Sequence, residues 1–449
     1  MKFLAILALL MTATSLTIDA RPTGKAGQIS LSIKKNDLPD YFSWKQKVKV
    51  NMNRALLKYS KNIQKAYDAG LVGLDAIQQL EAASIPVFIA SASKISLAKR
   101  NFNANNNSTA FATSSSTNSG KVVSSPINDE GNDIGYFGPI QVGGQTFNVV
   151  FDTGSADLWV PDQNCNDLAC NSHKKFDQTL SKSFSSNNAP FAIQYGTGSV
   201  SGVIAQETVS IFGAVSNNQT FGLTQTMSND FANTEFDGIL GMGLDQLSSE
   251  KAKTPFTQLF EQKAVSSPVF SFFLGRKKDS TDTQSQLTLG GVDPTKFTGT
   301  INFNKLVSQL GFWEIALDDA SVDGKPLGFT SKTAIIDTGT TLVIIPPNDA
   351  AALHAQIPGA VNQQGQFFVP CDTKSVIALT FGGVSYNISP KDLVRDPINQ
   401  QNLCVSGFAG GSIGGANQWL VGDTFLKNVV SAYDTQQLAV GFAPAKQIL

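Results

Sequence analysis

A seven-residue pattern occurs twice in this chain and limits how the two copies can be arranged in a fold. Residues 149–155 read VVFDTGS and residues 334–340 read AIIDTGT, and in both copies a proline lies nine residues after the aspartate. Each copy also has a distant companion of two apolar residues and a glycine, at residues 239–241 and 420–422. The shared flanks and companions predict two similar halves of roughly 170 residues, related by a pseudo-two-fold axis that brings equivalent points together.

The repeated aspartates, Asp152 and Asp337, have the surroundings of a reactive carboxylate pair. Each ends an apolar run and enters a Thr-Gly turn, with a Ser or Thr three residues later. The apolar run removes water from the carboxylate, the glycine lets backbone amides approach it, and the hydroxyl can donate a hydrogen bond to it. Two such carboxylates placed face to face cannot both ionise, so one keeps a proton. The pair can then activate a water molecule and polarise a peptide carbonyl, with no metal and no covalent intermediate required.

The composition of the chain indicates its fold class and excludes several kinds of protein. From about Val122 onward, short apolar runs rich in β-branched and aromatic residues alternate with turns of Gly, Asn, Asp and Ser, and residues 254–264 are one of few helical stretches. This pattern predicts a mainly β domain. Hydrophobic residues make up 41% of the chain, which excludes a mostly disordered protein. The formal net charge of -1 gives no electrostatic case for a nucleic-acid partner, and no apolar run after residue 20 reaches membrane-spanning length.

Several further stretches, together with the two aspartate segments, carry a family resemblance. They are FDTGSADLW from Phe151, IQYGTGSVSG from Ile193, FDGILGMG from Phe236, GFWEIALDD from Gly311, IIDTGTTL from Ile335 and WLVGDTFL from Trp419. The chain resembles the pepsin-type aspartic endopeptidases, particularly the secreted enzymes of lower fungi such as rhizopuspepsin, over about residues 127–444. The resemblance implies a bilobal, mainly β acid-protease fold, with two pseudo-two-fold-related β lobes and a cleft between them. The proton sharing described above is the family's own behaviour, and its pepsin pair is a standard example.

The resemblance also implies roles for residues around the two aspartates. Asp152 and Asp337 resemble the catalytic pair, and Thr153 and Thr338 match the threonines that brace the two loops against each other. The supporting turns and hydrogen-bond donors correspond to Gly154, Ser155, Gly339 and Thr340. Gly339 and Thr341 are expected to meet the substrate backbone from the second lobe.

A hairpin flap and a hydrophobic pocket are implied in the same way. Tyr195-Gly196-Thr197 resembles the tip of the flap that closes over substrate, with Gly196 and Thr197 meeting the substrate backbone, and Trp159 matches the partner of the flap tyrosine. The pocket for the residue before the scissile bond would be lined by Val150, Tyr195, Phe231, Phe236 and Ile239. Because all five are apolar or aromatic, large hydrophobic residues are expected there. Some fungal relatives that accept Lys carry Asp where this chain has Thr197, so weak cleavage after Lys is expected.

The four cysteines fit the family spacing. The resemblance implies one disulfide between Cys165 and Cys170 and another between Cys371 and Cys404. Each bridge would restrict the unfolded chain. No cofactor and no metal is expected, since His173 and His354 are the only histidines and neither has metal-ligand neighbours in the sequence.

The N-terminal part of the chain is organised differently. Residues 1–20 have the charged start, apolar run and small final residue of a signal peptide, so a secreted rather than vacuolar protein is expected. Residues 21–100 hold 14 Lys and Arg against 5 Asp and Glu, and residues 101–121 form a polar, flexible linker that is free of charge through residue 120. Residues 121–449 hold 19 basic against 29 acidic residues. The predicted lobes are residues 122–300 and 301–449. Asn106, Asn107, Asn218 and Asn387 begin glycan-acceptor patterns, the last followed by Pro390.

Residues 21–100, here called the basic module, and residues 121–449 carry opposite net charges. This suggests that the basic module is an inhibitory propeptide. At neutral pH it would lie over the acidic domain and offer a lysine to the carboxylate pair; the candidates are Lys58 (in a Lys-Tyr pair like the family's), Lys34 and Lys35. Acid would protonate the carboxylates and weaken the attraction, so self-activation at low pH is expected. Cleavage by a processing enzyme after Lys99-Arg100 is the alternative, and the mature N-terminus falls between residues 101 and 123. The mature protein is expected to be a monomer that binds extended polypeptides.

Two other function classes compete with this interpretation. Residues 410–414, GGSIG, match the nucleophile-elbow pattern of serine hydrolases, but no histidine follows Ser412 as that order requires. A non-catalytic peptide-binding protein could share the fold. Inactive relatives usually lose a catalytic aspartate or the flap tyrosine, and this chain keeps Asp152, Asp337 and Tyr195.

Overall fold

β-strands make up about half of the residues that the structure describes. The structure is a computed structural model, and it describes residues 18–22, 29–33, 120–131, 133–195, 198–276, 284–363, 365–398, 402–414 and 417–446. The chain divides into two compact units, Met1–Lys47 and Val48–Leu449, and each is described by itself. In the first unit, β1 (Ile18–Pro22) and β2 (Ile29–Ile33) form a two-stranded antiparallel sheet.

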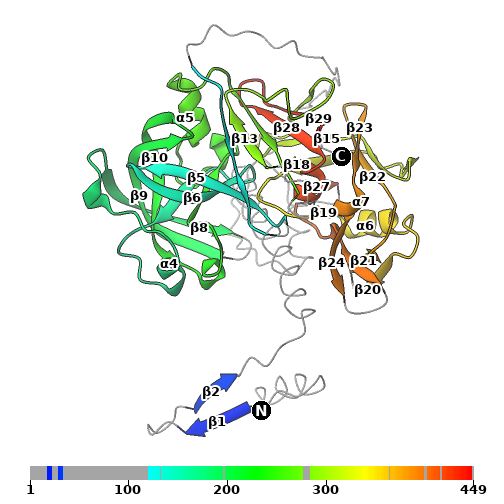
Figure 1. Cartoon of the computed structure of the whole chain (residues 1–449), viewed down its shortest axis with the longest axis horizontal. Helices are drawn as coiled ribbons and strands as arrows, with labels where there is room; N and C mark the ends of the chain where they lie inside the picture. The colour runs from blue at the N-terminus through cyan, green and yellow to red at the C-terminus, as the bar shows by residue number, and fades with distance from the viewer. Residues whose placement is uncertain are drawn as a thin grey trace, which may run out of the picture. The chain divides into compact units, whose positions relative to one another are not determined.

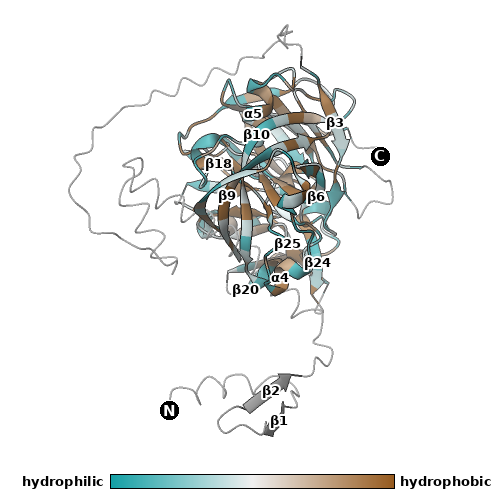
Figure 2. Cartoon of the chain, turned by 90° about the vertical axis from the view of Figure 1, so that its left-hand side faces the viewer, coloured by the Kyte–Doolittle hydropathy of each residue, from teal (hydrophilic) through white to brown (hydrophobic). Residues whose placement is uncertain are grey.

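The first half of the second unit is built on an eight-stranded sheet, coloured cyan to green in Figure 1. Its strands, in spatial order, are β4 (Asn128–Asp129), β5 (Tyr136–Val142), β6 (Gln145–Asp152), β11 (Gly238–Gly241), β7 (Leu158–Pro161), β10 (Ala214–Met227), β9 (Gly198–Ile211) and β8 (Ser185–Tyr195). β5 also pairs with β9, so the sheet folds back on itself. Over the last seven residues of β9, buried positions alternate with more exposed ones, because one face of the strand is packed and the other faces solvent. Figure 2 shows hydrophobic and hydrophilic residues next to each other along these strands.

The second half contains three smaller sheets, on the yellow-to-orange side of Figure 1. A five-stranded sheet has the order β15 (Glu314–Leu317), β18 (Lys332–Ile336), β27 (Gln418–Val421), β19 (Val343–Ile345) and β26 (Phe408–Gly410). One four-stranded sheet contains β17 (Lys325–Pro326), β16 (Asp319–Val322), β22 (Ile377–Phe381) and β23 (Val384–Ile388). The other contains β20 (Val361–Gln363), β21 (Gln366–Pro370), β25 (Leu403–Ser406) and β24 (Val394–Ile398).

A six-stranded antiparallel sheet joins the two halves. Its order is β14 (Asn302–Lys305), β29 (Ala439–Pro444), β28 (Val429–Asp434), β12 (Val269–Phe273), β13 (Gln286–Leu289) and β3 (Val123–Pro126). The predicted lobe boundary between residues 300 and 301 lies just before β14, but this sheet takes three strands from each side of it. The two β lobes therefore share one sheet, and the exact boundary between them stays a prediction.

The helices in the described residues are short and lie between strands. They are α4 (Leu168–Asn171), α5 (Pro255–Glu261), α6 (Pro347–His354), α7 (Pro390–Leu393) and α8 (Asp423–Leu426), with 3-10 turns η1 (Gln178–Leu180), η2 (Asn229–Phe231) and η3 (Asp245–Leu247). The helix expected over residues 254–264 corresponds to α5, which begins after the N-cap Thr254, whose hydroxyl accepts a hydrogen bond from Thr257 N–H. The mainly β, two-lobed fold class is confirmed.

The strand register shows that the sequence repeat is a structural repeat. β11 runs parallel to β6 and antiparallel to β7, and β27 runs parallel to β18 and antiparallel to β19. β7 and β19 then pair in parallel with β10 and β26 respectively. The distant apolar-apolar-Gly companion thus forms, in each half, the central strand beside the strand that carries the aspartate.

Most N-terminal predictions lie outside the described residues. These include the signal-peptide core, the helix-forming part of the basic module, the dibasic pair and nearly all of the linker, of which only Gly120 and Lys121 are described. Lys121 forms a bridge with Val265, and β3 follows directly. Within the described residues, no helix is both long and apolar enough to cross a membrane.

A buried histidine gives a prediction about acid stability. His354, 3% exposed at the end of α6, donates from Nδ1 to Ala350 O at 2.7 Å and accepts at Nε2 from the Ser406 hydroxyl at 2.7 Å. Burial lowers the pKa of His354 to about 4, against 6.5 ordinarily. Because the unfolded state binds the extra proton between these values, stability is present above about pH 6.5 and falls by about 3 kcal/mol as the pH drops through 4.

The substitution His354→Gln removes this titration. Urea unfolding at pH 7 and pH 4 should show that the variant loses about 3 kcal/mol less stability over this interval than the wild type. An equal loss of stability in both proteins would show that His354 does not control it.

Candidate active site

Asp152 and Asp337 lie at equivalent ends of the two repeated strand groups. Asp152 is the last residue of β6 and pairs with Gly241 of β11. Asp337 follows β18 directly, and its N–H donates to Val421 O of β27 at 3.0 Å. A parallel neighbour strand therefore fixes the backbone of each aspartate at the point where the chain leaves the sheet.

The loops that follow the two aspartates are joined by reciprocal hydrogen bonds. Thr153 Oγ1 donates to Ile336 O at 2.9 Å, and Thr338 Oγ1 donates to Phe151 O at 2.7 Å. The Thr153 N–H donates to Thr338 Oγ1 at 3.1 Å, and the Thr338 N–H donates to Thr153 Oγ1 at 3.0 Å. Each bond has a counterpart with the two halves exchanged, as a two-fold arrangement requires. Segments 185 residues apart thus meet at one place.

Each aspartate receives the same local donors. One carboxylate oxygen accepts a backbone N–H from the glycine two residues later, at 2.9 Å in both halves. The other accepts a hydroxyl from the residue three positions later, at 2.6 Å in both halves. The donors are Gly154 and Ser155 for Asp152, and Gly339 and Thr340 for Asp337. Two donors on each carboxylate fix its orientation.

Both carboxyl groups are buried, and the loop after Asp337 lies against Asp152. Asp152 is 4% exposed and Asp337 is fully buried. A Cβ atom added to Gly339 would lie 2.3 Å from Asp152 Oδ1, so the loop of the second aspartate packs directly against the first carboxylate. Only a glycine permits this approach. The Asp152 carboxylate therefore lies directly beside the turn that follows Asp337.

The two-fold symmetry is broken by the residue after each companion glycine. In the first half this residue is Met242, whose N–H donates to Asp152 O at 2.8 Å. In the second half it is Asp423, whose N–H donates to Thr340 O at 2.8 Å and whose carboxylate oxygens have no hydrogen-bond partner among the described residues. Burial raises the pKa of Asp423, and the charge of Asp337 adds to this effect, although Lys427 opposes it. The signal that could have singled out Asp423 is the difference between Gly-Met and Gly-Asp in the two repeats.

The proposed flap tyrosine is held by a tryptophan. Trp159 Nε1 donates to Tyr195 Oη at 2.7 Å, and Tyr195 is the last residue of β8. Burial, followed by the charges of Asp157 and Asp152, raises the pKa of Tyr195 well above its usual value, so the phenol stays neutral. Gly196 and Thr197 lie outside the described residues.

The residues predicted to line the hydrophobic pocket belong to one apolar cluster in the first lobe. The cluster contains Val150, Trp159, Tyr195, Phe231, Phe236 and Ile239. Phe231 lies at its centre, with ring centroids 5.5 Å from Trp159, 6.1 Å from Tyr195 and 6.5 Å from Phe236. Edge-to-face contacts of this kind fix ring orientations. Tyr195 is therefore packed against aromatic and aliphatic side chains of this cluster.

Thr341 is engaged within the protein. It is 5% exposed, its hydroxyl donates to Ile134 O, and its carbonyl accepts from the Thr424 N–H at 2.9 Å. Its predicted contact with substrate backbone remains a prediction.

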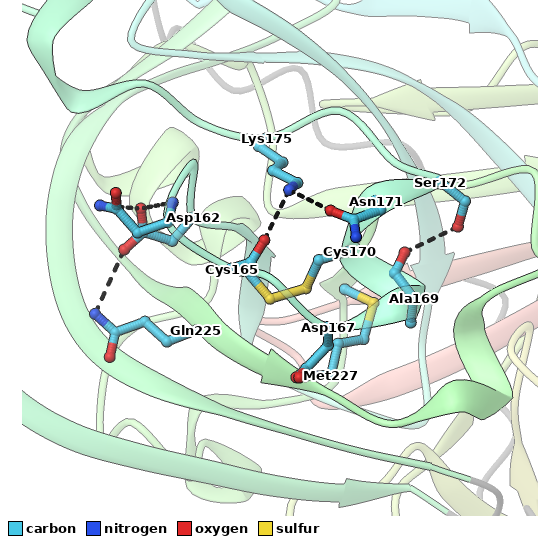
Figure 3. The surroundings of a disulfide bond; sticks show 11 residues. Asp162, Cys165, Asp167, Ala169, Cys170, Asn171, Ser172, Lys175, Gln225 and Met227 are labelled. Carbon is cyan, nitrogen blue, oxygen red and sulfur yellow. Dashed lines mark hydrogen bonds between the residues drawn. A yellow bond between two sulfur atoms is a disulfide. The ribbon is translucent and has the colours of Figure 1, made fainter. Parts of the chain in front are cut away.

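The structure contains both disulfides that the resemblance implied, Cys165–Cys170 and Cys371–Cys404. Figure 3 shows the first bridge, where Lys175 Nζ donates to Cys165 O at 2.7 Å. Asp167 lies beside this bridge, and its carboxylate accepts from the Met227 N–H at 2.9 Å. Because both cysteines are oxidised, this Cys-Asp-Cys group is not a set of thiolate ligands for a metal.

The rival serine motif lacks a histidine partner. Ser412 follows β26, whereas His354 hydrogen-bonds Ala350 and Ser406, and His173 Nε2 hydrogen-bonds Phe231 O. In the described residues, neither histidine therefore hydrogen-bonds Ser412. A serine-hydrolase mechanism needs that contact, so it has no support here.

Comparison with known proteins identifies the family. The model of the family described as "Eukaryotic aspartyl protease" matches residues 135–445, which include both aspartate loops and the hairpin. The chain belongs to the eukaryotic aspartyl protease family. It is accordingly a hydrolase of the aspartic protease class, of the pepsin type.

Curated relatives of this aspartyl protease come from fungi and animals. It is 40% identical over 321 residues to the aspartic-type endopeptidase ctsD of Aspergillus fumigatus, covering 71% of this chain and 67% of the relative. It is 40% identical to a probable aspartic-type endopeptidase CTSD of Arthroderma benhamiae, covering 71% of this chain but only 63% of that protein. It is 35% identical to pepsin A of Sus scrofa, covering 70% of this chain and 82% of pepsin. The chain thus spans about two thirds of the length of the two fungal relatives.

The threonine brace of this protease gives a prediction about stability. Thr338→Val removes a hydroxyl in a site that is 1% exposed, leaving Thr153 N–H and Phe151 O without partners. We expect a loss of about 2–4 kcal/mol in unfolding free energy, because buried unpaired groups cost about 1–3 kcal/mol each. In a double-mutant cycle with Thr153→Val, the coupling should reach at least about 1 kcal/mol.

The matched control is Thr380→Val, since the Thr380 hydroxyl bonds only Ser385 on the surface in the described residues. It should change stability by less than about 0.5 kcal/mol. Independent, additive effects of Thr153→Val and Thr338→Val would contradict the brace.

Proposed function

We propose that this chain is a secreted aspartic endopeptidase that hydrolyses peptide bonds at acidic pH, using a water molecule activated between Asp152 and Asp337. The proposal is supported chiefly by the reciprocal threonine hydrogen bonds, which bring the two aspartate loops together although 185 residues separate them. It is also supported by the matching hydrogen-bond donors, which hold the two carboxylates in equivalent orientations.

The proposed reaction follows from the sharing of one proton. The charged carboxylate removes a proton from the water as it attacks the peptide carbonyl, and the protonated carboxyl donates a hydrogen bond to the carbonyl oxygen. The proton then passes to the leaving amine. Acidic conditions suit this arrangement because the pair must hold one proton, and it loses that proton as the pH rises.

We propose further that the enzyme prefers large hydrophobic residues at the scissile bond. The support is the apolar cluster around Phe231, which stands next to Tyr195. The predicted weak cleavage after Lys belongs to the same proposal, because Thr197 supplies no negative charge for a lysine. Substrate would bind as an extended strand through main-chain hydrogen bonds.

We propose that the protein is made as a secreted, glycosylated and monomeric zymogen. The basic residues 21–100 carry 14 Lys and Arg against 5 Asp and Glu, and the later part of the chain is acidic. Mutual attraction would hold this propeptide over the carboxylate pair until acid protonates carboxylates and weakens the contact. N-terminal sequencing of the secreted form distinguishes self-cleavage from processing after Lys99-Arg100.

The test of the proposed function is digestion of acid-denatured haemoglobin. The full-length protein, acidified to about pH 3–4, should release peptides after large hydrophobic residues, and few after Lys. The same protein held at about pH 7 should release none. Folded protein that binds peptides but releases no products at any acidic pH would instead indicate a peptide-binding role.

A further inference from the structure

Two carboxyl groups that the proposed mechanism does not use meet beside the hairpin formed by β8 and β9, here called the flap hairpin. Asp157, between β6 and β7, accepts hydrogen bonds from Ser248 Oγ at 2.7 Å, Ser249 N–H at 2.9 Å and Glu250 N–H at 3.2 Å. Asp157 is 4% exposed and Glu250 is 7% exposed. A segment 93 residues away thus places a second acid next to Asp157.

The two acids are not equally satisfied. The Asp157 carboxylate accepts three hydrogen bonds. Glu250 receives a backbone hydrogen bond from Gly222, but its Oε1 has no partner, and no ion pair with either acid occurs in the described residues. The nearby Lys251 and Lys253 are exposed, and Lys253 pairs with Glu261. A second charge at Glu250 would therefore be buried, uncompensated and next to Asp157.

This electrostatic situation fixes the state of Glu250. Burial raises the pKa of Glu250 well above its usual value, the charge of Asp157 adds to the effect, and the Gly222 hydrogen bond only partly opposes it. At acidic pH the Glu250 carboxyl is uncharged and can stay buried. Because the raised pKa belongs to the folded state, the stability this burial contributes is present below about pH 4.5 and is lost as the pH rises through the raised value.

The Glu250 carboxyl lies against Gly222 of β10, next to a residue of β8, the strand that carries Tyr195. A Cβ atom added to Gly222 would lie 2.7 Å from Glu250 Oε1 and 2.5 Å from the ring of Phe191, so the carboxyl and this ring pack against the same backbone. Gly222 pairs with Trp159 of β7, and Phe191 lies on β8 four residues before Tyr195. Glu250 therefore lies where β7, β8 and β10 come together.

We propose that Glu250 is a positioning residue for the flap hairpin. While uncharged, it fills the space between Gly222 and Phe191 and holds β8 at the distance from β7 at which Trp159 reaches Tyr195. When it ionises, it leaves this dry site, Phe191 loses its support, and the Trp159–Tyr195 hydrogen bond is no longer maintained. As the pH rises toward neutral, activity is then lost through ionisation of Glu250 as well as through loss of the proton shared by Asp152 and Asp337. This proposal rests on the proposed function in assigning Tyr195 to substrate.

The decisive experiment is the pH profile of kcat/KM for Glu250→Gln, which keeps the shape of the side chain but cannot ionise. We expect its alkaline limb to lie at least about one pH unit above that of the wild type, with the acid limb unchanged. Glu250→Asp, which can still ionise, should keep a limb at or below the wild-type position. The control Glu261→Gln, at an exposed and ion-paired glutamate, should leave both limbs unchanged. An unshifted alkaline limb in Glu250→Gln overturns the proposal.

Amide hydrogen exchange tests the same idea without turnover and without relying on a folded variant. In the wild type, protection of β8 and β9, corrected for the intrinsic pH dependence of exchange, should fall at least about tenfold between about pH 5 and pH 8, while that of β28 and β29 stays constant. Constant protection of β8, or an equal loss in β28, overturns the proposal. An absence of proteolysis at every pH would refute the proposed function, whereas the exchange result would still decide whether Glu250 positions the flap hairpin.

Discussion

Asp337→Asn lowers kcat/KM by at least about 10⁴-fold and leaves the fold intact, if the two aspartates share the catalytic proton. The asparagine amide matches the carboxylate in size, and its oxygen can still accept from Gly339 N–H or the Thr340 hydroxyl. It cannot hold the shared proton, so the water is no longer activated and the carbonyl is no longer polarised by an acid. Removing one member of a catalytic unit usually costs about as much as removing all of it.

The measurement compares haemoglobin or peptide hydrolysis at acidic pH with thermal unfolding of the same samples. Asp152→Asn should give the same loss, because the two aspartates have equivalent donors. Asp372→Asn, at an exposed aspartate of the second half, is the matched control and should retain full activity. Near-normal turnover in a folded Asp337→Asn protein would show that the pair is not the catalytic centre.

The repeated aspartate segments could be predicted from the sequence because their information is local. The apolar run, the turn and the hydroxyl donor lie within seven residues, and each makes its predicted local contact in the structure. The apolar-apolar-Gly companions at residues 239–241 and 420–422 could also be found. One such tripeptide alone would be uninformative, but it occurs at a similar distance after both aspartates. Their position as parallel neighbours of the aspartate strands needed the structure.

Other features depend on contacts that leave no local pattern. The six-stranded sheet pairs β3, near residue 124, with β13, and it pairs β12 of the first half with β28 of the second half. Strands that are more than 150 residues apart in the sequence therefore lie side by side. The pairing of Asp157 with Glu250 is of the same kind. In sequence, Glu250 stands between Ser249 and Lys251 and has the composition of a solvated turn, yet tertiary packing buries it.

Two acidic residues other than Asp152 and Asp337 are buried, although acidic side chains usually lie on the surface. Asp423 and Glu250 have carboxyl oxygens without hydrogen-bond partners in the described residues, and both lie next to residues of the proposed site. Both have a raised pKa, so both are uncharged in acid and unfavourable when ionised. The stability that these two groups contribute therefore falls as the pH rises through their pKa values, which is opposite in sign to the contribution of His354.

Gly422→Ala is expected to destabilise the protein by about 3 kcal/mol or more, or to prevent folding. The backbone at Gly422 has φ of -103° and ψ of -158°, which any residue adopts, so glycine is needed for space alone. An added Cβ atom would lie 1.9 Å from Thr340 O and 2.6 Å from Leu342 O. Both oxygens belong to the backbone, and neither can move without displacing the loop whose Thr340 hydroxyl donates to Asp337.

The clash with Thr340 O is also expected to lower activity in whatever part of the variant protein folds. Variant protein that does fold must move Thr340 away from the carboxylate, so kcat should drop while KM changes little. Gly241→Ala, the equivalent change in the first half, would place its Cβ atom 2.5 Å from the Ala156 backbone and should behave alike. Gly410→Ala is the matched control, because its nearest contact would be 3.4 Å, to the Phe367 side chain. Urea unfolding and kinetics of the three variants decide the matter: if Gly422→Ala resembles Gly410→Ala, the companion glycine does not set the distance between its strand and the aspartate loop.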